Sequence, residues 1–252
     1  MAVDDRVVLV TGASRGIGRA VAARFAERGA TVIVHYGVNG AAARQTLAAL
    51  PGGGHLALAA DLADPDAVSG LVAQVVDARG RIDVLVNNAG IYEAHPVLST
   101  GYDEWRNAWR RTLDTNLVGP ANLIHEVVPH MVAQGGGRIV NVSSRGAFRG
   151  EPVCPAYGAS KAGLNSLGQS LAQALAPHGI YVTTVAPGFV ETDMATEILD
   201  GPGGDAIRGQ SPMQRVATAD EVARVVVFLA EPGSETTTGA IVDVNGASYL
   251  RT

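Results

Sequence analysis

Short runs of apolar residues alternate along the chain with longer segments in which apolar positions recur every three or four residues. The short runs are rich in Val and Ile, as buried strands are, and the longer segments have the period of helices that cover a sheet. The predicted strands are residues 7–11, 31–35, 55–60, 82–87, 138–143, 181–186 and 240–244. The predicted helices are residues 16–28, 40–50, 65–79, 102–132, 156–177 and 219–230. This alternation predicts an α/β fold, a doubly wound, seven-stranded parallel sheet flanked by helices on both faces.

No internal repeat, low-complexity tract or linker divides the chain, and 252 residues with 47% apolar side chains can bury one large core. We therefore expect a single domain over residues 1–252. The longest stretch without a regular pattern, residues 187–212, follows the end of a predicted strand, where doubly wound sheets bind ligands. We expect residues 188–212 to form a lid over the site, with an ordinary surface loop as the alternative.

Composition narrows the classes of function. A net charge of −5, with Lys and Arg scattered, argues against nucleic acid and anionic membrane as partners. The N-terminal residues show no basic segment followed by an apolar stretch, and no apolar run is long enough for a membrane span, so we expect a cytoplasmic protein. A single cysteine, Cys154, excludes an internal disulfide and a cysteine-based zinc site, and no H-E-x-x-H spacing occurs, so no metal is expected.

A glycine-rich segment follows the first predicted strand and opens the first predicted helix. Its glycines allow the backbone to approach a pyrophosphate placed on the helix N-terminus, which indicates a dinucleotide cofactor. The glycines stand at intervals of four and two, which differs from the G-x-G-x-x-G spacing. The residues expected to contact the cofactor here are Gly12, Ser14, Arg15, Gly16, Ile17 and Gly18.

The tip of the second strand indicates which dinucleotide is bound. A carboxylate there pairs with the ribose 2′-hydroxyl of NAD and repels the extra phosphate of NADP. No Asp or Glu occurs between Glu27 and Asp61, and the tip carries Tyr36 and Asn39 instead. The guanidinium of Arg15 suits forked phosphate contacts. The sequence therefore favours NADP(H), with NAD(H) as the alternative.

Two later strand ends carry residues that are expected to border the cofactor. Asp61, with Leu62 beside it, follows the third strand and is placed to accept a hydrogen bond from the adenine amino group. Asn88, Ala89 and Gly90 form a small polar turn after the fourth strand. Purely structural roles are the alternative for both segments.

Chemistry-bearing residues gather at the fifth strand and the helix after it. Tyr157 and Lys161 are four residues apart in a predicted helix, so the ammonium can approach the phenol oxygen. A nearby cation lowers a tyrosine pKa from about 10 by roughly one to three units, which makes proton exchange near neutrality feasible. Ser144 places a hydroxyl at the same sheet edge, and Asn116 is a polar residue in an otherwise apolar helical pattern.

The ordered motifs resemble those of the short-chain dehydrogenases/reductases over essentially the whole chain. They are T-G-A-S-R-G-I-G, Asp61-Leu62, N-N-A-G, Asn116, the serines at 143 and 144, Y-G-A-S-K and P-G-F-V-E-T. The resemblance is to the single-domain branch and implies a Rossmann fold. It also implies an NADP(H)-preferring oxidoreductase that interconverts a carbonyl and a secondary alcohol.

The resemblance implies a role for each matching residue. Tyr157 is implied to act as general acid and base and Ser144 to orient the substrate oxygen. Lys161 is implied to bond the nicotinamide ribose and lower the tyrosine pKa, and Asn116 to hold a relay water. Four residues of the 187–192 segment are implied to border the nicotinamide carboxamide: Pro187, Gly188, Val190 and Thr192.

The substrate is open at this level. The motifs are similar to those of 3-oxoacyl-(acyl-carrier-protein) reductases, yet residues 130–137 lack Lys and Arg, and His178 stands where such reductases carry a basic docking residue. A 3-oxoacyl thioester of another carrier, a small ketone and a small cyclic or sugar-like alcohol are alternatives. Arg145 and Arg149 are placed to engage an acidic substrate group, with ordinary exposed loop arginines as the alternative. A mostly apolar pocket wall is expected from Tyr92, His95, Phe148, Cys154, Phe189, Met194 and Met213. Ordinary core or loop packing is the alternative for each of them, and for His95 and Cys154 it is preferred to a direct chemical role.

The resemblance further implies a homotetramer formed through helices 102–132 and 156–177 and the last strand. An NADP(H)-binding sensor or scaffold without turnover is the alternative function, since a fold does not guarantee chemistry. The presence of Tyr157 and Lys161 argues against that alternative. A nucleotide-sugar epimerase is disfavoured because no appended substrate domain is present.

Overall fold

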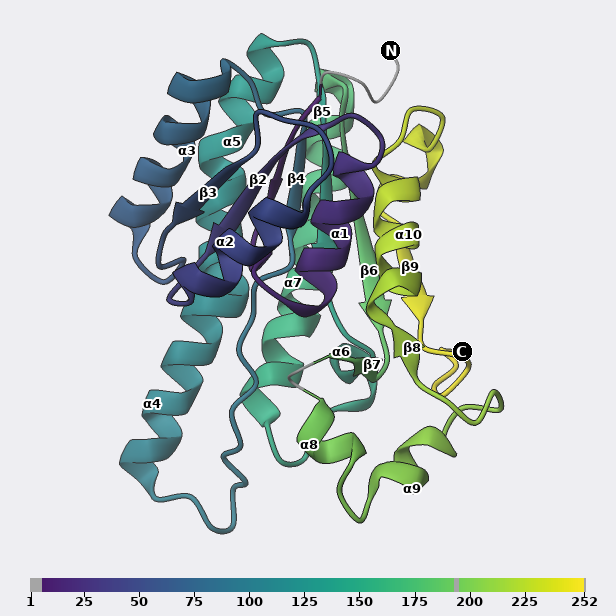
Figure 1. The fold of residues 1–252 in the computed structure, drawn as a ribbon. Coiled ribbons are helices and arrows are strands. Elements are labelled where there is room, and N and C mark those ends of the chain that lie inside the picture. Colours follow the sequence, from purple (N-terminus) through teal and green to yellow (C-terminus); the bar gives the residue numbers. More distant parts are fainter. Residues whose placement is uncertain (1–5, 193–194, 252) are drawn as a thin grey trace.

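The computed structural model describes residues 6–192 and 195–251. Within them, seven parallel strands form the main sheet in the order β3, β2, β1, β4, β5, β6, β9 (Figure 1). Their bounds are β1 Val7–Val10, β2 Thr31–Tyr36, β3 Leu56–Ala59, β4 Val84–Asn87, β5 Gly137–Val142, β6 Ile180–Pro187 and β9 Ile241–Val244. The predicted parallel sheet is confirmed, and the strand ends differ from the predicted ones by one or two residues.

The main helices connect these strands and cover both faces of the sheet (Figure 1). Their bounds are α1 Gly16–Ala26, α2 Gly40–Ala49, α3 Pro65–Arg79, α4 Tyr102–Leu113, α5 Gly119–Ala133, α7 Pro155–Leu175 and α10 Ala219–Leu229. Local signals agree with these bounds. The Asp64 side chain caps α3 ahead of Pro65, and the left-handed Gly80 ends that helix. Thr218 and Glu221 form a capping box at the start of α10.

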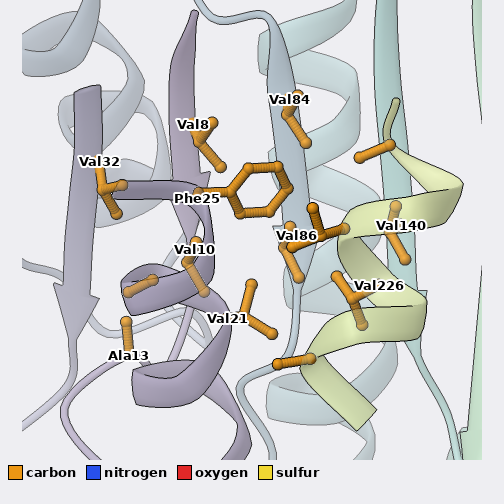
Figure 2. Packing of buried hydrophobic residues seen from close by; sticks show 14 of the residues in the cluster. Val8, Val10, Ala13, Val21, Phe25, Val32, Val84, Val86, Val140 and Val226 are labelled. Atoms are coloured by element: carbon orange, nitrogen blue, oxygen red, sulfur yellow. The ribbon is translucent and has the colours of Figure 1, made fainter. Parts of the chain in front are cut away.

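One face of the sheet is covered by α1 and α10. Strand register aligns the four valines Val34, Val10, Val86 and Val140 across β2, β1, β4 and β5. Phe25 of α1 and Val226 of α10 pack in the same fully buried cluster (Figure 2). Because alternate residues of a strand face opposite ways, the neighbours of these valines belong to the other core.

The second face is covered by α3, α5 and α7. Leu9, Ile33 and Leu85 lie on this side, where Leu71 of α3 and Leu123 of α5 are fully buried against them. Strands that are apolar on both faces explain the continuous apolar runs of the sequence. The two cores hold the carboxyl ends of the strands in place, and these ends carry the candidate site.

Two parts of the chain differ from the sequence prediction. The predicted helix 102–132 is interrupted by a π-helical turn, Asp114–Val118, between α4 and α5. The 187–212 stretch has regular structure of its own: β7 Val190–Glu191, which pairs with β8 Ala217–Thr218, and two short helices, α8 Thr196–Leu199 and α9 Gly204–Arg208. Figure 1 shows α8 and α9 beyond the carboxyl ends of the main strands. A short helix α6, Gly146–Arg149, was also not predicted.

Candidate active site

A cleft of about 590 Å³ opens at the carboxyl ends of β1 and β4. From β1 the strand order runs through β2 to β3 at one edge of the sheet, and from β4 it runs through β5 and β6 to β9 at the other edge. Doubly wound sheets bind ligands at the point where the strand order reverses in this way. Most of the predicted site residues line it: Gly12, Ser14, Arg15, Gly16, Ile17, Asn39, Asp61, Leu62, Asn88, Ala89, Gly90, Ser144, Tyr157, Lys161, Pro187, Gly188, Val190 and Thr192. Gly18, Tyr36 and Asn116 are not part of the cleft lining.

The two loops that border the cleft are tied to each other. The hydroxyl of Thr11 accepts hydrogen bonds from the backbone N–H groups of Asn88 and Ala89, at 2.9 and 3.0 Å. The side-chain amide of Asn88 donates to the carbonyls of Thr11 and Gly12, at 2.8 and 3.2 Å. The turn after β4 is thus held against the turn after β1, which explains why a polar Asn-Asn turn stands at this position.

The glycine-rich loop fits a bound pyrophosphate. Gly12 has a φ of +63°, and a Cβ there would lie 2.9 Å from Cα of Ala89. A Cβ at Gly18 would lie 2.3 Å from the carbonyl oxygen of Gly12, so Gly18 serves the close packing of α1 on the loop and not the cleft wall. Arg15, at the N-cap, provides no side-chain cap for α1. The first N–H groups of that helix therefore remain available to an anion in the cleft.

His35, at the end of β2, is a cleft residue that sequence reasoning did not select. Its Nδ1 accepts from the N–H of Gly12 at 3.2 Å, and its Nε2 lies 3.0 Å from the carbonyl oxygen of Ala60. These partners assign the proton to Nε2. Burial lowers the pKa of His35 to about 4, so the ring is neutral near pH 7 and links three strand ends. The sequence did contain one signal for His35, since it is a polar residue near the end of an otherwise apolar predicted strand.

The predicted cofactor residues at the tip of β2 have different surroundings. Asn39 lines the cleft and caps α2, where its side chain accepts from the N–H of Ala42 at 3.0 Å. The ring of Tyr36 packs against Gly40 at the start of α2, where an added Cβ would lie 3.2 Å from it. Arg15 is exposed at the cleft, and its guanidinium has no hydrogen bond or ion pair within the described residues.

Ser144 and Tyr157 present their hydroxyl groups together in the cleft. Ser144 follows β5, and its Oγ accepts from the N–H of Gly146 at 3.0 Å. Burial raises the pKa of Tyr157 to about 12, and a side-chain hydrogen bond with Ser144 opposes that shift. The expected lowering of the tyrosine pKa below 10 is therefore not found in this structure, because desolvation of the phenolate outweighs the favourable contacts.

Lys161 lies one helical turn after Tyr157 and is almost completely buried. Its Nζ donates to the carbonyl of Val142 at 2.8 Å and lies 5.8 Å from the centre of the Tyr157 ring. Desolvation lowers the pKa of Lys161 to about 8. Ser143 supports this helix, as its hydroxyl donates to the carbonyl of Lys161 at 3.2 Å.

Asn116 lies in the π-helical turn and is fully buried behind the cleft wall. Its Oδ1 accepts from the N–H of Ile91 at 2.8 Å, and its Nδ2 donates to the Ile91 carbonyl at 3.0 Å and to Ser160 Oγ at 3.2 Å. A Cβ at Gly90 would lie 3.2 Å from Oδ1 of Asn116 and 3.5 Å from Nζ of Lys161. Gly90 thus lets the cleft wall approach both side chains.

The segment after β6 closes the other side of the cleft. The N–H of Gly188 donates to the Val244 carbonyl at 3.1 Å, and a Cβ at Gly16 would lie 3.3 Å from Cγ2 of Thr192. Thr192 therefore reaches across the cleft to the glycine-rich loop. Its hydroxyl donates to the Val190 carbonyl at 3.4 Å.

Arg145 does not stand free for an acidic substrate group, contrary to the expectation from sequence. It is buried, and its guanidinium donates to Ser248 Oγ at 2.6 Å and to Gln210 Oε1 at 2.7 Å. It therefore ties the end of β5 to the 188–212 segment and to the C-terminal residues. Arg149 is exposed and lies outside the cleft lining.

The expected apolar wall is only partly present. Tyr92 and Phe189 line the cleft, whereas His95, Phe148, Cys154 and Met213 do not, and Met194 lies outside the described residues. His95 is buried and bonds the backbone of Glu93 and Ala156 instead. The cleft also contains the carboxylate of Glu151, which sequence reasoning did not select. No spacing rule pointed to Glu151, since it becomes part of the site only through the loop after β5.

This fold and site define an NAD(P)-dependent oxidoreductase that acts on CH–OH groups. The protein family described as enoyl-(acyl carrier protein) reductase matches residues 12–247. The chain belongs to the short-chain dehydrogenase/reductase family.

Three relatives illustrate the range of this family. The chain is 38% identical to the 3-oxoacyl-(acyl-carrier-protein) reductase FabG of Staphylococcus aureus over 244 residues, covering 96% of this chain and 97% of the relative. It is 37% identical to the FabG of Vibrio harveyi over 250 residues, covering 99% and 100%. It is 41% identical to the L-rhamnose 1-dehydrogenase (NAD(P)(+)) of Azotobacter vinelandii over 253 residues, covering 98% and 97%.

Two further findings concern metals and membranes. Among the described residues, no group of three or more His, Cys, Asp or Glu side chains is arranged to hold a metal ion. No helix in the same part of the chain has the length and apolar character to cross a membrane.

Proposed function

We propose that this protein is an NADP(H)-preferring reductase that interconverts a carbonyl and a secondary alcohol, with Tyr157 as general acid and base. The observation that carries the proposal is the convergence of the Ser144 and Tyr157 hydroxyls, with the Lys161 ammonium one helical turn away, in the cleft that the glycine-rich loop also lines. The alternative of a sensor without turnover requires no such group of proton donors.

Each residue has a distinct task in the reduction. A nicotinamide cofactor supplies the hydride when bound. The Ser144 Oγ accepts from the N–H of Gly146, so its O–H group points away from that N–H and donates to the substrate oxygen when substrate lies beside Tyr157. Tyr157 donates its phenolic proton to that oxygen as negative charge develops there. Lys161 holds a positive charge near the resulting tyrosinate.

Two features support NADP(H) over NAD(H), and a third residue, Asp61, marks the adenine end of the site for either cofactor. The β2 tip contributes His35, Gly37, Val38 and Asn39 to the cleft, none of which carries a negative charge that would repel a 2′-phosphate. The guanidinium of Arg15 is exposed on the glycine-rich loop and has no partner within the described residues. Asp61 is at the end of β3, where it accepts from the N–H of Ala63 at 2.9 Å and lies at the adenine end of the proposed site.

Substrate class, assembly and location extend the same proposal. The relatives' names span 3-oxoacyl thioesters and a sugar, so a 3-oxoacyl thioester, a small ketone and a sugar-like alcohol are the candidates. The protein acts in the cytoplasm as a single domain, with residues 188–212 as a lid. It assembles as a homotetramer through α4, α5, α7 and the region of the last strand, β9. Exposed apolar side chains on α4 and at its π-helical turn, including Tyr102 and Val118, suit such an interface. Light scattering that gives a monomer at micromolar concentration would contradict the tetramer.

The proposed activity is tested by titrating the purified protein with NADPH and NADH and then following NADPH absorbance with ketones, β-ketoesters and sugars. We expect tighter binding of NADPH and consumption of NADPH with at least one carbonyl. Binding of NADPH with no turnover on any carbonyl or alcohol would support the sensor function instead.

A further inference from the structure

Glu151 places a carboxylate in the cleft beside the reacting groups. It lines the same cleft as Tyr157, Ser144 and Tyr92. The ring of Tyr92 packs edge-on against the ring of Tyr157, with 4.9 Å between the ring centres, and the negative charge of Glu151 contributes to raising the pKa of both phenol groups. A charged acceptor at this position is unlike the mostly apolar wall that the sequence predicts.

The protein backbone is shaped to put the carboxylate there. A Cβ at Gly146 would lie 2.5 Å from Oε1 of Glu151, so the carboxylate packs directly against Gly146. Gly146 is also the residue whose N–H donates to Oγ of Ser144. The carbonyl of Glu151 in turn accepts from the N–H of Cys154 in the turn that precedes α7, which starts the helix carrying Tyr157.

Within residues 6–192 and 195–251, no hydrogen-bond donor or cation pairs with the Glu151 side chain. The two nearest guanidinium groups act on it only through space, and that of Arg145 is already bonded to Ser248 and Gln210. Burial raises the pKa of Glu151. Because Glu151 lines the cleft, its carboxylate is placed to accept a hydrogen bond from a ligand that brings a donor into the cleft.

We propose that Glu151 is a specificity-determining residue that accepts a hydrogen bond from a hydroxyl group of the substrate close to the reacting carbon. This inference rests on the proposed function and narrows it to hydroxyl-bearing carbonyls and their alcohols, such as hydroxyketones, diols and cyclic sugars. A site built to bond a substrate hydroxyl strongly rejects the analogue that lacks it, because the buried polar group is then left unpaired. An acyl chain, which has no donor at this place, is the disfavoured substrate.

The test compares matched substrates that differ in one hydroxyl group. 2-Hydroxycyclohexanone and cyclohexanone are reduced with NADPH by the wild-type protein and by Glu151→Gln and Glu151→Ala. We expect the wild type to favour the hydroxyketone over cyclohexanone by tenfold or more in kcat/KM, and we expect this ratio to fall to about one in both variants. Glu93→Gln is the matched control, since Glu93 pairs with Arg111 outside the cleft and is expected to keep the preference.

Failure of the inference and failure of the proposed function give different results. Equal kcat/KM for the two ketones in the wild type, or an equal loss for both in the variants, overturns the role of Glu151 and leaves the reductase intact. If the wild type turns over neither ketone, calorimetric titration of the NADP⁺-loaded protein with 1,2-cyclohexanediol and with cyclohexanol decides. Tighter binding of the diol that is lost in Glu151→Gln supports the inference, and equal binding of both ligands overturns it.

Discussion

The side-chain amide of Asn116 satisfies both backbone polar groups of Ile91, accepting from its N–H at 2.8 Å and donating to its carbonyl at 3.0 Å. Ile91 lines the cleft, whereas Asn116 is fully buried behind it. The π-helical turn that carries Asn116 thus positions the wall opposite Tyr157. π-Helical turns inside α-helices are frequent at functional sites.

Replacing Asn116 by Leu is expected to destabilise the protein and misplace the cleft wall. Each backbone group of Ile91 left without a partner costs about 1–3 kcal/mol of unfolding free energy. Denaturant unfolding measures this loss, and kcat/KM measures the effect on the site. Asn107→Leu, on the exposed part of α4, is the control and is expected to change neither quantity. Wild-type stability in Asn116→Leu would contradict the positioning role.

Tyr157→Phe is expected to remove turnover and spare cofactor binding. The change deletes the proton donor and very little volume, and general acid catalysis is worth about 10²–10⁴-fold in rate. Steady-state kinetics with any accepted carbonyl measures the loss, and fluorescence titration with NADPH measures the binding. A variant with unchanged kcat would show that Tyr157 is not the acid. Tyr181→Phe, whose ring stacks with Arg138 away from the cleft, is the matched control.

The reduction rate is expected to fall as pH rises through about 8. Because the pKa of Lys161 is lowered from 10.5 to about 8, its ammonium is present below pH 8 and is lost above it. The Tyr157 proton donor, with a pKa near 12, stays protonated throughout this window. Loss of the nearby positive charge destabilises the tyrosinate that forms in the reaction. A kcat profile from pH 6 to 10 checks the decline, and a flat profile would contradict it.

Lys161→Arg serves as the comparison for this profile. Arginine keeps its charge at all these pH values. We expect the variant to be slower, because the larger head group must fit the buried site, but to show no decline near pH 8. A decline of the same size in this variant would assign the titration to another group.

Arg15→Ala is expected to weaken the binding of NADPH more than the binding of NADH, because a charge-assisted contact with the 2′-phosphate is lost. The Kd for NADPH divided by the Kd for NADH is expected to rise by about tenfold or more. Titrations at two salt concentrations check this, since salt weakens an exposed ionic contact. Arg44→Ala, an arginine near the start of α2 that does not line the cleft, is the control. Equal weakening of NADPH and NADH would show that Arg15 does not read the 2′-phosphate.

The sequence alone determined the architecture, because apolar strands buried on both faces and helices of regular period leave a local signal. It also determined most of the cleft residues, since the carboxyl ends of parallel strands meet at one edge of the sheet. The glycine-rich loop, the Ser144 hydroxyl and the Tyr157 and Lys161 pair all belong to this group. Each is marked by its place directly after a strand or on one face of a helix.

Only the tertiary structure decided which polar groups are paired and which are free. Arg145 and Glu151 are both charged residues of the segment between β5 and α7, yet the guanidinium is bonded to Ser248 and Gln210 and the carboxylate faces the cleft. The π-helical turn at Asn116 and the raised pKa of Tyr157 were likewise not readable, because both depend on burial and on contacts between distant segments. The partners of a polar group and the loss of water around it depend on residues that are distant in the sequence, so local sequence patterns do not predict them.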